Sequence, residues 1–458
     1  MSAGANNGPA SKRRELAIRA GLSICVCILL GCSGKPQVPP PENLGEPPLV
    51  FDQGLSTDEV VANVYLDATS SMKGFVKADQ IEPYLGTIEK AEQVFAIGWS
   101  KASVHCFKFG AKIVPLPGES CHLYVFKEGF YNLPKSEDIT RIDEILEKSP
   151  QDAKNLTLVF TDLYQDRADI GRLLRAFRDS TIPRKLSVGI VGIRSNFRGK
   201  IFDIGARSFS GEWDTKGNRA KFRPFYLFII GRRGNVSHFM DELFRRSKDT
   251  GPDQAVLLSP DVTASLVEWS KTKRLIEQGL VERRSLFQAP KSRFSYGSLQ
   301  VRGRSTCTLK VEADYAPVKY APTLDWNHVP QPRVQVRTFQ VTTDGKLQGV
   351  DLARVVDGDL QLQNNKLVFT LTIHSDRWAG RGLYAFDVRP NLEADSFRLP
   401  TWCKGWSVTE EERLGLKNPA SFDGSKTLNL FEFISGLWRA MLESHKPQLG
   451  ALYLYLEK

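Results

Sequence analysis

The stretch VANVYLDATSSM, residues 61–72, decides the fold and the site that the sequence predicts. Its first half is β-branched and apolar, which indicates a buried strand. The strand ends on Asp67, and hydroxyl side chains follow at Thr69 and Ser71. In a tight strand-to-helix turn, the spacing i, i+2, i+4 aims these three side chains at one point. Oxygen ligands suit a hard divalent cation, with Mg²⁺ favoured and Ca²⁺ or Mn²⁺ as alternatives.

Strand-like and helix-like patterns alternate after this stretch. The expected strands cover residues 61–66, 103–109, 122–126, 156–160, 186–193 and 224–230. The expected helices cover residues 80–95, 139–148, 170–178 and 236–246. Strands separated by helices imply crossover connections. The pattern therefore predicts an α/β domain at residues 52–250 with a doubly wound, mainly parallel sheet.

The pattern Asp67-x-Thr69-x-Ser71 resembles the DxSxS motif of von Willebrand factor A-type (VWA) domains, with threonine in place of the first serine. The run Leu156–Phe160, followed by Thr161-Asp162, resembles a second element of these domains. Leu163 stands where that element usually has glycine. The resemblance implies a VWA/Rossmann-like sheet whose strands end at a metal ion-dependent adhesion site.

The same resemblance implies the remaining ligands and the function. Asp162 would complete the metal site, and Thr140, which lies 22 residues before it, would supply one more hydroxyl. An open coordination position would then accept a carboxylate from a protein partner. We therefore expect a binding protein and not an enzyme. The metal ligands expected are Asp67, Thr69, Ser71, Thr140 and Asp162.

Two alternatives remain open for these residues. Aspartate, serine and threonine after a strand are also the residues that cap helix N-termini, so Asp162 could serve its own helix. The site could also be a degenerate remnant that binds no cation. In that case the protein would be a cation-independent structural scaffold of an envelope complex.

The amino terminus indicates export and lipid anchoring. Basic residues at 12–14 precede an apolar stretch at residues 20–31, which has the length of a signal-peptide core. Leu29-Leu30-Gly31-Cys32 resembles a bacterial lipobox, which implies cleavage before Cys32 and acylation of that residue. Ser33 favours the outer membrane if the host is Gram-negative. We therefore expect a bacterial cell-envelope location, with membrane contact through the lipid anchor only.

Seven cysteines are present, and two lie in the expected signal peptide. After lipidation of Cys32, four remain for an oxidising compartment, and an even number suggests two disulfides. Three pairings can be drawn. We favour Cys106–Cys121, which spans the turn sequence PLPG at residues 115–118, and Cys307–Cys403.

Beyond residue 250 the pattern changes. A helical bridge is expected at residues 251–295, and period-2 segments with polar turns predict a β-sandwich-like domain at residues 296–395. Residues 396–458 contain tryptophans, an amphipathic helix around residues 430–442 and a terminal strand at an existing sheet edge. We expect the helix to pack against one of the two domains, with a partner-binding surface as the alternative. With residues 1–31 as signal peptide and 32–51 as lipidated cysteine and proline-rich spacer, the chain divides into six segments.

Composition and motifs exclude several classes of function. The chain has 458 residues, a 41% hydrophobic fraction and a net charge of +10, values typical of a globular protein of more than one domain. The basic residues are spread along the chain and not interleaved with aromatic residues, so nucleic acid is not expected as a partner. The sequence contains no GxSxG, P-loop, HExxH or GxGxxG motif.

Overall fold

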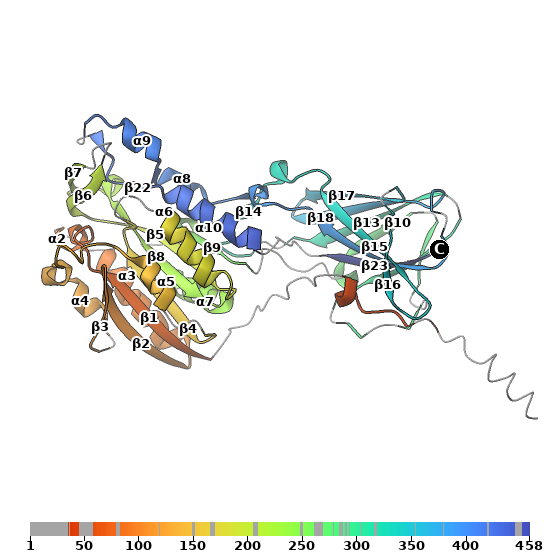
Figure 1. Cartoon of the computed structure of the whole chain (residues 1–458), viewed down its shortest axis with the longest axis horizontal. Helices are drawn as coiled ribbons and strands as arrows, with labels where there is room; N and C mark the ends of the chain where they lie inside the picture. Colours follow the sequence, from red (N-terminus) through yellow and green to blue (C-terminus); the bar gives the residue numbers. More distant parts are fainter. Residues whose placement is uncertain are drawn as a thin grey trace, which may run out of the picture.

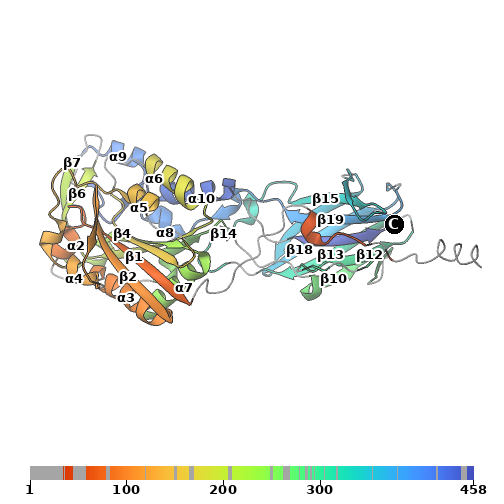
Figure 2. The same cartoon turned by 60° about the horizontal axis from the view of Figure 1, so that its bottom comes forward.

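The computed structural model describes residues 35, 37–44, 58–78, 83–118, 120–148, 152–164, 170–204, 209–247, 251–260, 269–277, 279–283, 287–288, 291–292, 294–303, 305–315, 318–352, 354–378, 380–418, 421–444 and 451–458. The expected signal peptide and Cys32 lie outside these residues. Figures 1 and 2 show two bodies along the long axis of the molecule. We call them the site lobe, built around the sheet that begins with residues 59–67, and the strand-rich lobe.

The site lobe is centred on a seven-stranded sheet of order β3-β2-β1-β4-β8-β5-β9. Its strands are β1 (Glu59–Asp67), β2 (Lys101–Phe109), β3 (Ile113–Leu116), β4 (Asn155–Thr161), β5 (Ser187–Ser195), β8 (Arg223–Gly231) and β9 (Ala255–Leu258). β1 pairs in parallel with both β2 and β4. The pairs β2–β3, β4–β8, β5–β8 and β5–β9 are all antiparallel.

The predicted fold class is therefore wrong, because the sheet is mixed and does not have the doubly wound, mainly parallel pattern. The cause lies between residues 195 and 223. Instead of a crossover helix, this link contains a two-stranded hairpin of β6 (Arg198–Ile204) and β7 (Phe209–Asp214), and a short 3₁₀ turn at Arg219–Lys221. Without a crossover, β8 returns antiparallel to β5 and lies between β5 and β4. The apolar pattern of residues 224–230 indicates a strand but carries no information on its direction.

Helices cover both faces of this sheet. α3 (Tyr84–Gly98) and α7 (Arg233–Arg246) pack on one face, where Leu158 and Ile229 are fully buried. α5 (Ile142–Lys148), α6 (Ile170–Ala176) and α10 (Leu430–Ser444) pack on the other, with Val159 and Phe228. The ring of Phe433 in α10 lies 5.9 Å from that of Phe228. The amphipathic helix thus packs against a domain, as expected, and its apolar side is buried.

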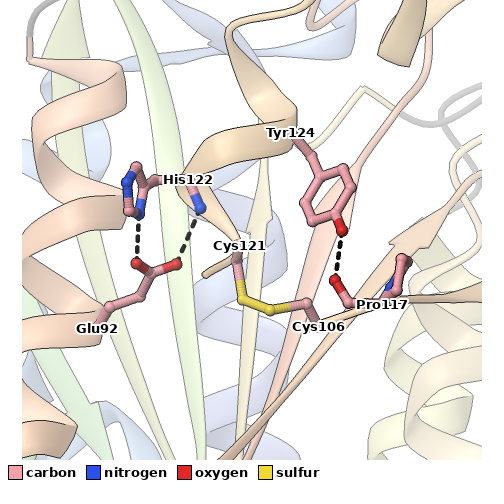
Figure 3. Close-up of a disulfide and its surroundings, with 6 residues drawn as sticks. All are labelled: Glu92, Cys106, Pro117, Cys121, His122 and Tyr124. Carbon is pink, nitrogen blue, oxygen red and sulfur yellow. Dashed lines mark hydrogen bonds and ion pairs between the residues drawn. A yellow bond between two sulfur atoms is a disulfide. The ribbon is translucent and has the colours of Figure 1, made fainter. Parts of the chain in front are cut away.

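A disulfide ties β2 to the short helix α4 (His122–Val125), a segment that the sequence analysis expected to be a strand. Cys106 and Cys121 form the bond, which is the first of the two expected pairings (Figure 3). Next to it, Glu92 of α3 accepts a hydrogen bond of 2.9 Å from the backbone N–H of His122. Its other oxygen lies 2.5 Å from the His122 ring nitrogen Nδ1. These contacts hold α4 against α3.

The second expected disulfide is absent, since Cys307 and Cys403 are free and buried. Cys307 lies in β13 (Thr306–Asp314) of the strand-rich lobe. Cys403 lies in α8 (Thr401–Gly405), which packs against α10 in the site lobe. The expected pairing requires both cysteines in one C-terminal region, whereas the chain returns to the site lobe after residue 390.

Two sheets form the strand-rich lobe. The four-stranded sheet has the order β10-β13-β18-β17, and the six-stranded sheet has the order β11-β12-β23-β19-β15-β16. Apolar side chains of both sheets belong to one buried cluster, including Leu371 of the first and Val388 of the second. The remaining strand bounds are β10 (Lys273–Ile276), β11 (Leu280–Glu282), β12 (Gly297–Val301), β15 (Val334–Val341), β16 (Leu347–Gly349), β17 (Val356–Gln363), β18 (Lys366–His374), β19 (Leu383–Pro390) and β23 (Leu452–Glu457).

The expected helical bridge and the expected edge position of the terminal strand are both wrong. The described residues within 251–295 form β9, β10, β11 and two short 3₁₀ turns, not a helical bridge. β10 pairs with β13, which gives this segment the backbone partners that favour a strand. The terminal strand β23 lies inside its sheet, parallel to β12 and antiparallel to β19, and not at an edge.

The proline-rich segment is also not a free spacer where it is described. Residues Pro41–Leu44 form a 3₁₀ turn, and Val38 and Leu44 are buried against the strand-rich lobe. The Tyr455 hydroxyl donates a hydrogen bond of 2.6 Å to the carbonyl of Pro39. Residues 37–44 are therefore fixed to the strand-rich lobe. Among the helices described, none has the length and apolar character needed to cross a membrane.

Candidate functional site

The site begins where β1 leaves the sheet. The last six residues of β1 are buried, and its final residue, Asp67, is fully buried. One carboxylate oxygen of Asp67, Oδ1, accepts hydrogen bonds from the Thr69 backbone N–H at 3.0 Å and from the Thr69 hydroxyl at 2.6 Å. The Thr69 hydroxyl lies 3.1 Å from that of Ser71. The i, i+2, i+4 spacing thus directs the three side chains to one place, as expected.

The neighbouring strand β4 supplies the second carboxylate. Leu66 pairs with Phe160, so Asp67 and Thr161 end their strands side by side. The Thr161 hydroxyl donates to Asp67 Oδ2 at 2.7 Å. Asp162, also fully buried, accepts a hydrogen bond of 3.1 Å from the Ser71 hydroxyl.

Leu163 turns the chain directly after this carboxylate. Its φ is +60°, in the left-handed region that favours glycine. Its N–H donates to the Thr161 hydroxyl at 3.1 Å, and the N–H of Tyr164 donates to Asp162 at 3.1 Å. The position where the resembled motif has glycine therefore does require a glycine-like backbone, and this chain adopts it with leucine.

Thr140 reaches the site from the loop before α5. Its hydroxyl donates to Asp67 Oδ2 at 3.2 Å and lies 3.4 Å from the Thr69 hydroxyl. Nearby, Asp138 accepts a 2.7 Å hydrogen bond from the backbone N–H of Ser70, which joins this loop to the turn after β1.

All five residues selected from the sequence therefore converge, and each is at most 3% exposed. This burial, together with the neighbouring Asp162 charge, raises the pKa of Asp67 to about 7. A nearby cation would favour the ionised form of that carboxylate.

Sequence reasoning missed Arg223, which begins β8 and is 5% exposed. Its Nη2 donates to Asp162 Oδ2 at 3.1 Å, and its Nη1 contacts the carbonyl of Gly424 at 3.4 Å. Its guanidinium carbon lies 5.3 Å from the centre of the Phe197 ring. The only signal in the sequence was an arginine directly before an apolar strand. Thr161 and Asp138 were also not assigned a role.

The oxygen atoms of the five side chains are suitable ligands for a hard divalent cation. Two carboxylates and three hydroxyls offer oxygen atoms only, which suits Mg²⁺ or Ca²⁺ better than softer metals. No group of three or more His, Cys, Asp or Glu side chains that could hold a metal occurs in the described part of the chain, and this site has two carboxylates. Arg223 already places one positive charge beside Asp162, so the protein itself neutralises part of the negative charge of the two carboxylates.

A pocket of about 50 Å³ adjoins the site on the Arg223 side. Asp162 and Arg223 line it, and residues 201–202, 422 and 426–428 form much of the remaining wall. Comparison with known proteins adds no assignment, because no protein-family model and no curated protein matches the chain.

Proposed function

We propose that this protein is a cell-envelope lipoprotein that binds a protein partner through a divalent-cation site. Asp67, Thr69, Ser71 and Thr140 hold the cation, and Asp162 completes the set of ligands directly or through water. The partner supplies a carboxylate to the remaining coordination position. The observation that carries the proposal is the convergence of these five side chains, linked by contacts of 2.6–3.4 Å.

The burial of the site sets a condition on partner binding. Because the five side chains are almost fully buried, a partner carboxylate reaches the cation only after part of the cover moves. The segment around Gly424 is one part of this cover, since its carbonyl contacts Arg223. Displacement of Arg223 from Asp162 would open the site and free a carboxylate oxygen for the cation.

The position of the site in the molecule agrees with an anchored binding protein. α2 (Gly74–Lys77), which follows the Asp67 turn, and the β6–β7 hairpin lie at the end of the site lobe away from the strand-rich lobe (Figures 1 and 2). Val38, six residues after Cys32, is buried against the strand-rich lobe. If Cys32 is acylated, the strand-rich lobe would lie nearest the membrane and the candidate site would face away from it.

Calorimetric titration of the full-length protein in detergent with Mg²⁺, Ca²⁺ and Mn²⁺ tests the cation site. We expect saturable binding that is lost in Asp67→Ala and kept in Asp179→Ala. Asp179 is a matched control because its side chain is 65% exposed and pairs only with Arg178 among the interactions described. Equal binding in Asp67→Ala and the parent protein would reject the site.

The proposed lipid anchor at Cys32 is tested separately from the cation site. Cys32→Ser should abolish incorporation of labelled palmitate and release the protein from the membrane fraction. Retention of label in Cys32→Ser would reject Cys32 as the lipidated residue, without affecting the cation site.

The Arg223–Asp162 ion pair favours a second candidate, a cation-independent scaffold of an envelope complex. The pair neutralises one carboxylate without any metal. Partner capture that survives EDTA and Asp67→Ala would support this candidate over the first. Deletion of the C-terminal segment would be a poor test, because α10 belongs to the core of the site lobe.

A further inference from the structure

The pocket beside Asp162 has features that the proposed cation site does not use. Its walls are mainly apolar and come from separate parts of the chain. The side chains that form them include Ile170, Ile201, Phe202, Phe422 and Leu428. The ring of Tyr164 lies 5.7 Å from that of Phe202, so two aromatic rings lie together at this wall. Such a surface is suited to an apolar group and not to a hydrated ion.

The charged groups of the pocket are mostly positive. Arg223, Arg413 and Lys426 line it, against the single carboxylate of Asp162. Asp162 is paired with Arg223, and Arg413 is paired with Glu410. Lys426 is partly exposed and lies near enough to Glu412 to lower the pKa of that carboxyl, after the larger effect of the Thr409 backbone hydrogen bond. The lining of the pocket thus combines apolar side chains with three cationic ones.

Arg223 brings a buried cationic group to the lining of this pocket. Its Nε is buried and has no hydrogen-bond partner among the described residues, although both terminal nitrogens are engaged. A buried donor of a charged group that lacks an acceptor costs more than an ordinary lost hydrogen bond. An anionic group bound in the pocket would add to the charge compensation that Asp162 gives this guanidinium.

We propose that this pocket binds a short carboxylate with an apolar tail. Arg223 and Lys426 bind the carboxylate, and the tail lies against the apolar side chains of the lining. The same chemistry is offered by a free short-chain acid and by the C-terminal residue of a peptide with an apolar side chain. This pocket adjoins the cation site and shares Asp162 with it, but its ligand is bound by the Arg223 guanidinium and not by the carboxylates.

The test is calorimetric titration of the full-length protein with hexanoate in the presence of EDTA, which removes any contribution from the cation site. Hexanamide is the matched ligand, since it has the same tail without the charge. Saturable binding of hexanoate, at least about tenfold tighter than hexanamide, is expected. No saturation, or equal affinity for the two ligands, would overturn the proposal.

Two lysine variants locate the binding. Lys426→Met keeps the length of the side chain and removes its charge, and we expect about tenfold weaker hexanoate binding. Lys417→Met is the control, because Lys417 is exposed and does not line the pocket. Unchanged binding in Lys426→Met, or the same loss in both variants, would contradict the assignment. Both lysines are at least partly exposed, so neither variant threatens the fold.

A short peptide ending in leucine, with a free or an amidated C-terminus, identifies the source of the carboxylate. Tighter binding of the free-acid peptide than of hexanoate would assign the pocket to a peptide C-terminus. Binding of hexanoate without binding of the peptide would assign it to a small acid. Failure of both the peptide and hexanoate would reject the site.

Discussion

Arg223 and Asp162 form a buried ion pair, with 3.1 Å between Nη2 and Oδ2, at the place where the sequence predicts a metal ligand. The side chains of Arg223 and Asp162 are 6% and 0% exposed. The pair joins the start of β8 to the end of β4, because these neighbouring strands run antiparallel. The antiparallel direction of β8, which the sequence analysis did not foresee, is therefore what brings a guanidinium to the candidate cation site.

Loss of this guanidinium should destabilise the protein. Arg223→Met leaves the Asp162 carboxylate buried without its cationic partner, and breaking a buried pair in this way costs about 3–5 kcal/mol. Urea unfolding of the site lobe measures the effect, with Arg219→Met at an exposed position as the control. Mg²⁺ should restore part of the lost stability in Arg223→Met and raise that of the parent protein less. A loss below about 1 kcal/mol would show that the pair is not structurally important.

The stability of the metal-free protein should fall as pH rises from about 4 to 7. Burial and the Asp162 charge raise the pKa of Asp67 from 3.8 to about 7, so the folded state binds more protons than the unfolded state in this window. The effect is at most on the order of 4 kcal/mol and levels off above pH 7. Urea titrations in EDTA at several pH values measure it, and Asp67→Asn should remove the slope. The same slope in Asp67→Asn would assign the pH dependence to other groups.

A divalent cation should reverse this dependence. Its ligand is the ionised Asp67 carboxylate, so cation binding competes with the proton. Below pH 7 we expect the affinity for Mg²⁺ to fall by up to about tenfold per pH unit. Calorimetry at pH 6 and pH 8 checks this, and equal affinity at both values would show that Asp67 does not bind the cation as a carboxylate.

Removal of the Cys106–Cys121 disulfide should weaken the α3–α4 side of the site lobe. The bond closes a loop with a sequence separation of 15, for which chain entropy alone gives about 3 kcal/mol. The double variant Cys106→Ser with Cys121→Ser should unfold at lower urea concentration than the parent protein. The variant Cys307→Ser with Cys403→Ser should keep its sensitivity to reductant, because those residues form no disulfide. An unchanged midpoint after reduction of the parent protein would refute this role.

The two free thiols should be unreactive in the native protein. Burial raises the pKa of Cys403 to about 12 and that of Cys307 above its usual value, so little thiolate forms near neutral pH. A thiol reagent such as Ellman's reagent should therefore modify both only after addition of denaturant. Rapid modification before unfolding would contradict the buried positions.

The candidate site could be predicted from the sequence largely because its determinants are local. Asp67, Thr69 and Ser71 lie within one turn, and the strand before Asp162 is a continuous apolar run of the kind found in buried strands. Thr140 came from the resemblance to a known motif. Arg223 could not be predicted, because it reaches the site through the antiparallel pairing of β8, and sequence periodicity does not encode strand direction.

The errors in the fold also arise from contacts between parts of the chain that are far apart in the sequence. The apolar patterns of β4, β5 and β8 marked strands, but they did not show that β8 lies between the other two. The pairing of Cys307 with Cys403 failed for a related reason, since the chain leaves the strand-rich lobe after β19, packs α10 on the site lobe and then returns as β23. The packing of whole helices and strands determines where the chain crosses between the lobes. The local sequence pattern carries no signal of it.

Diffraction data from crystals grown with Mn²⁺, collected at the manganese absorption edge, would show whether a cation binds among these side chains. We predict one anomalous peak among the oxygen atoms of Asp67, Thr69 and Ser71, at about 2.0–2.3 Å from the direct ligands. The peak should be absent in crystals of Asp67→Ala. Crystals of the parent protein without a peak at this position, and with Arg223 still bound to Asp162, would contradict the cation site.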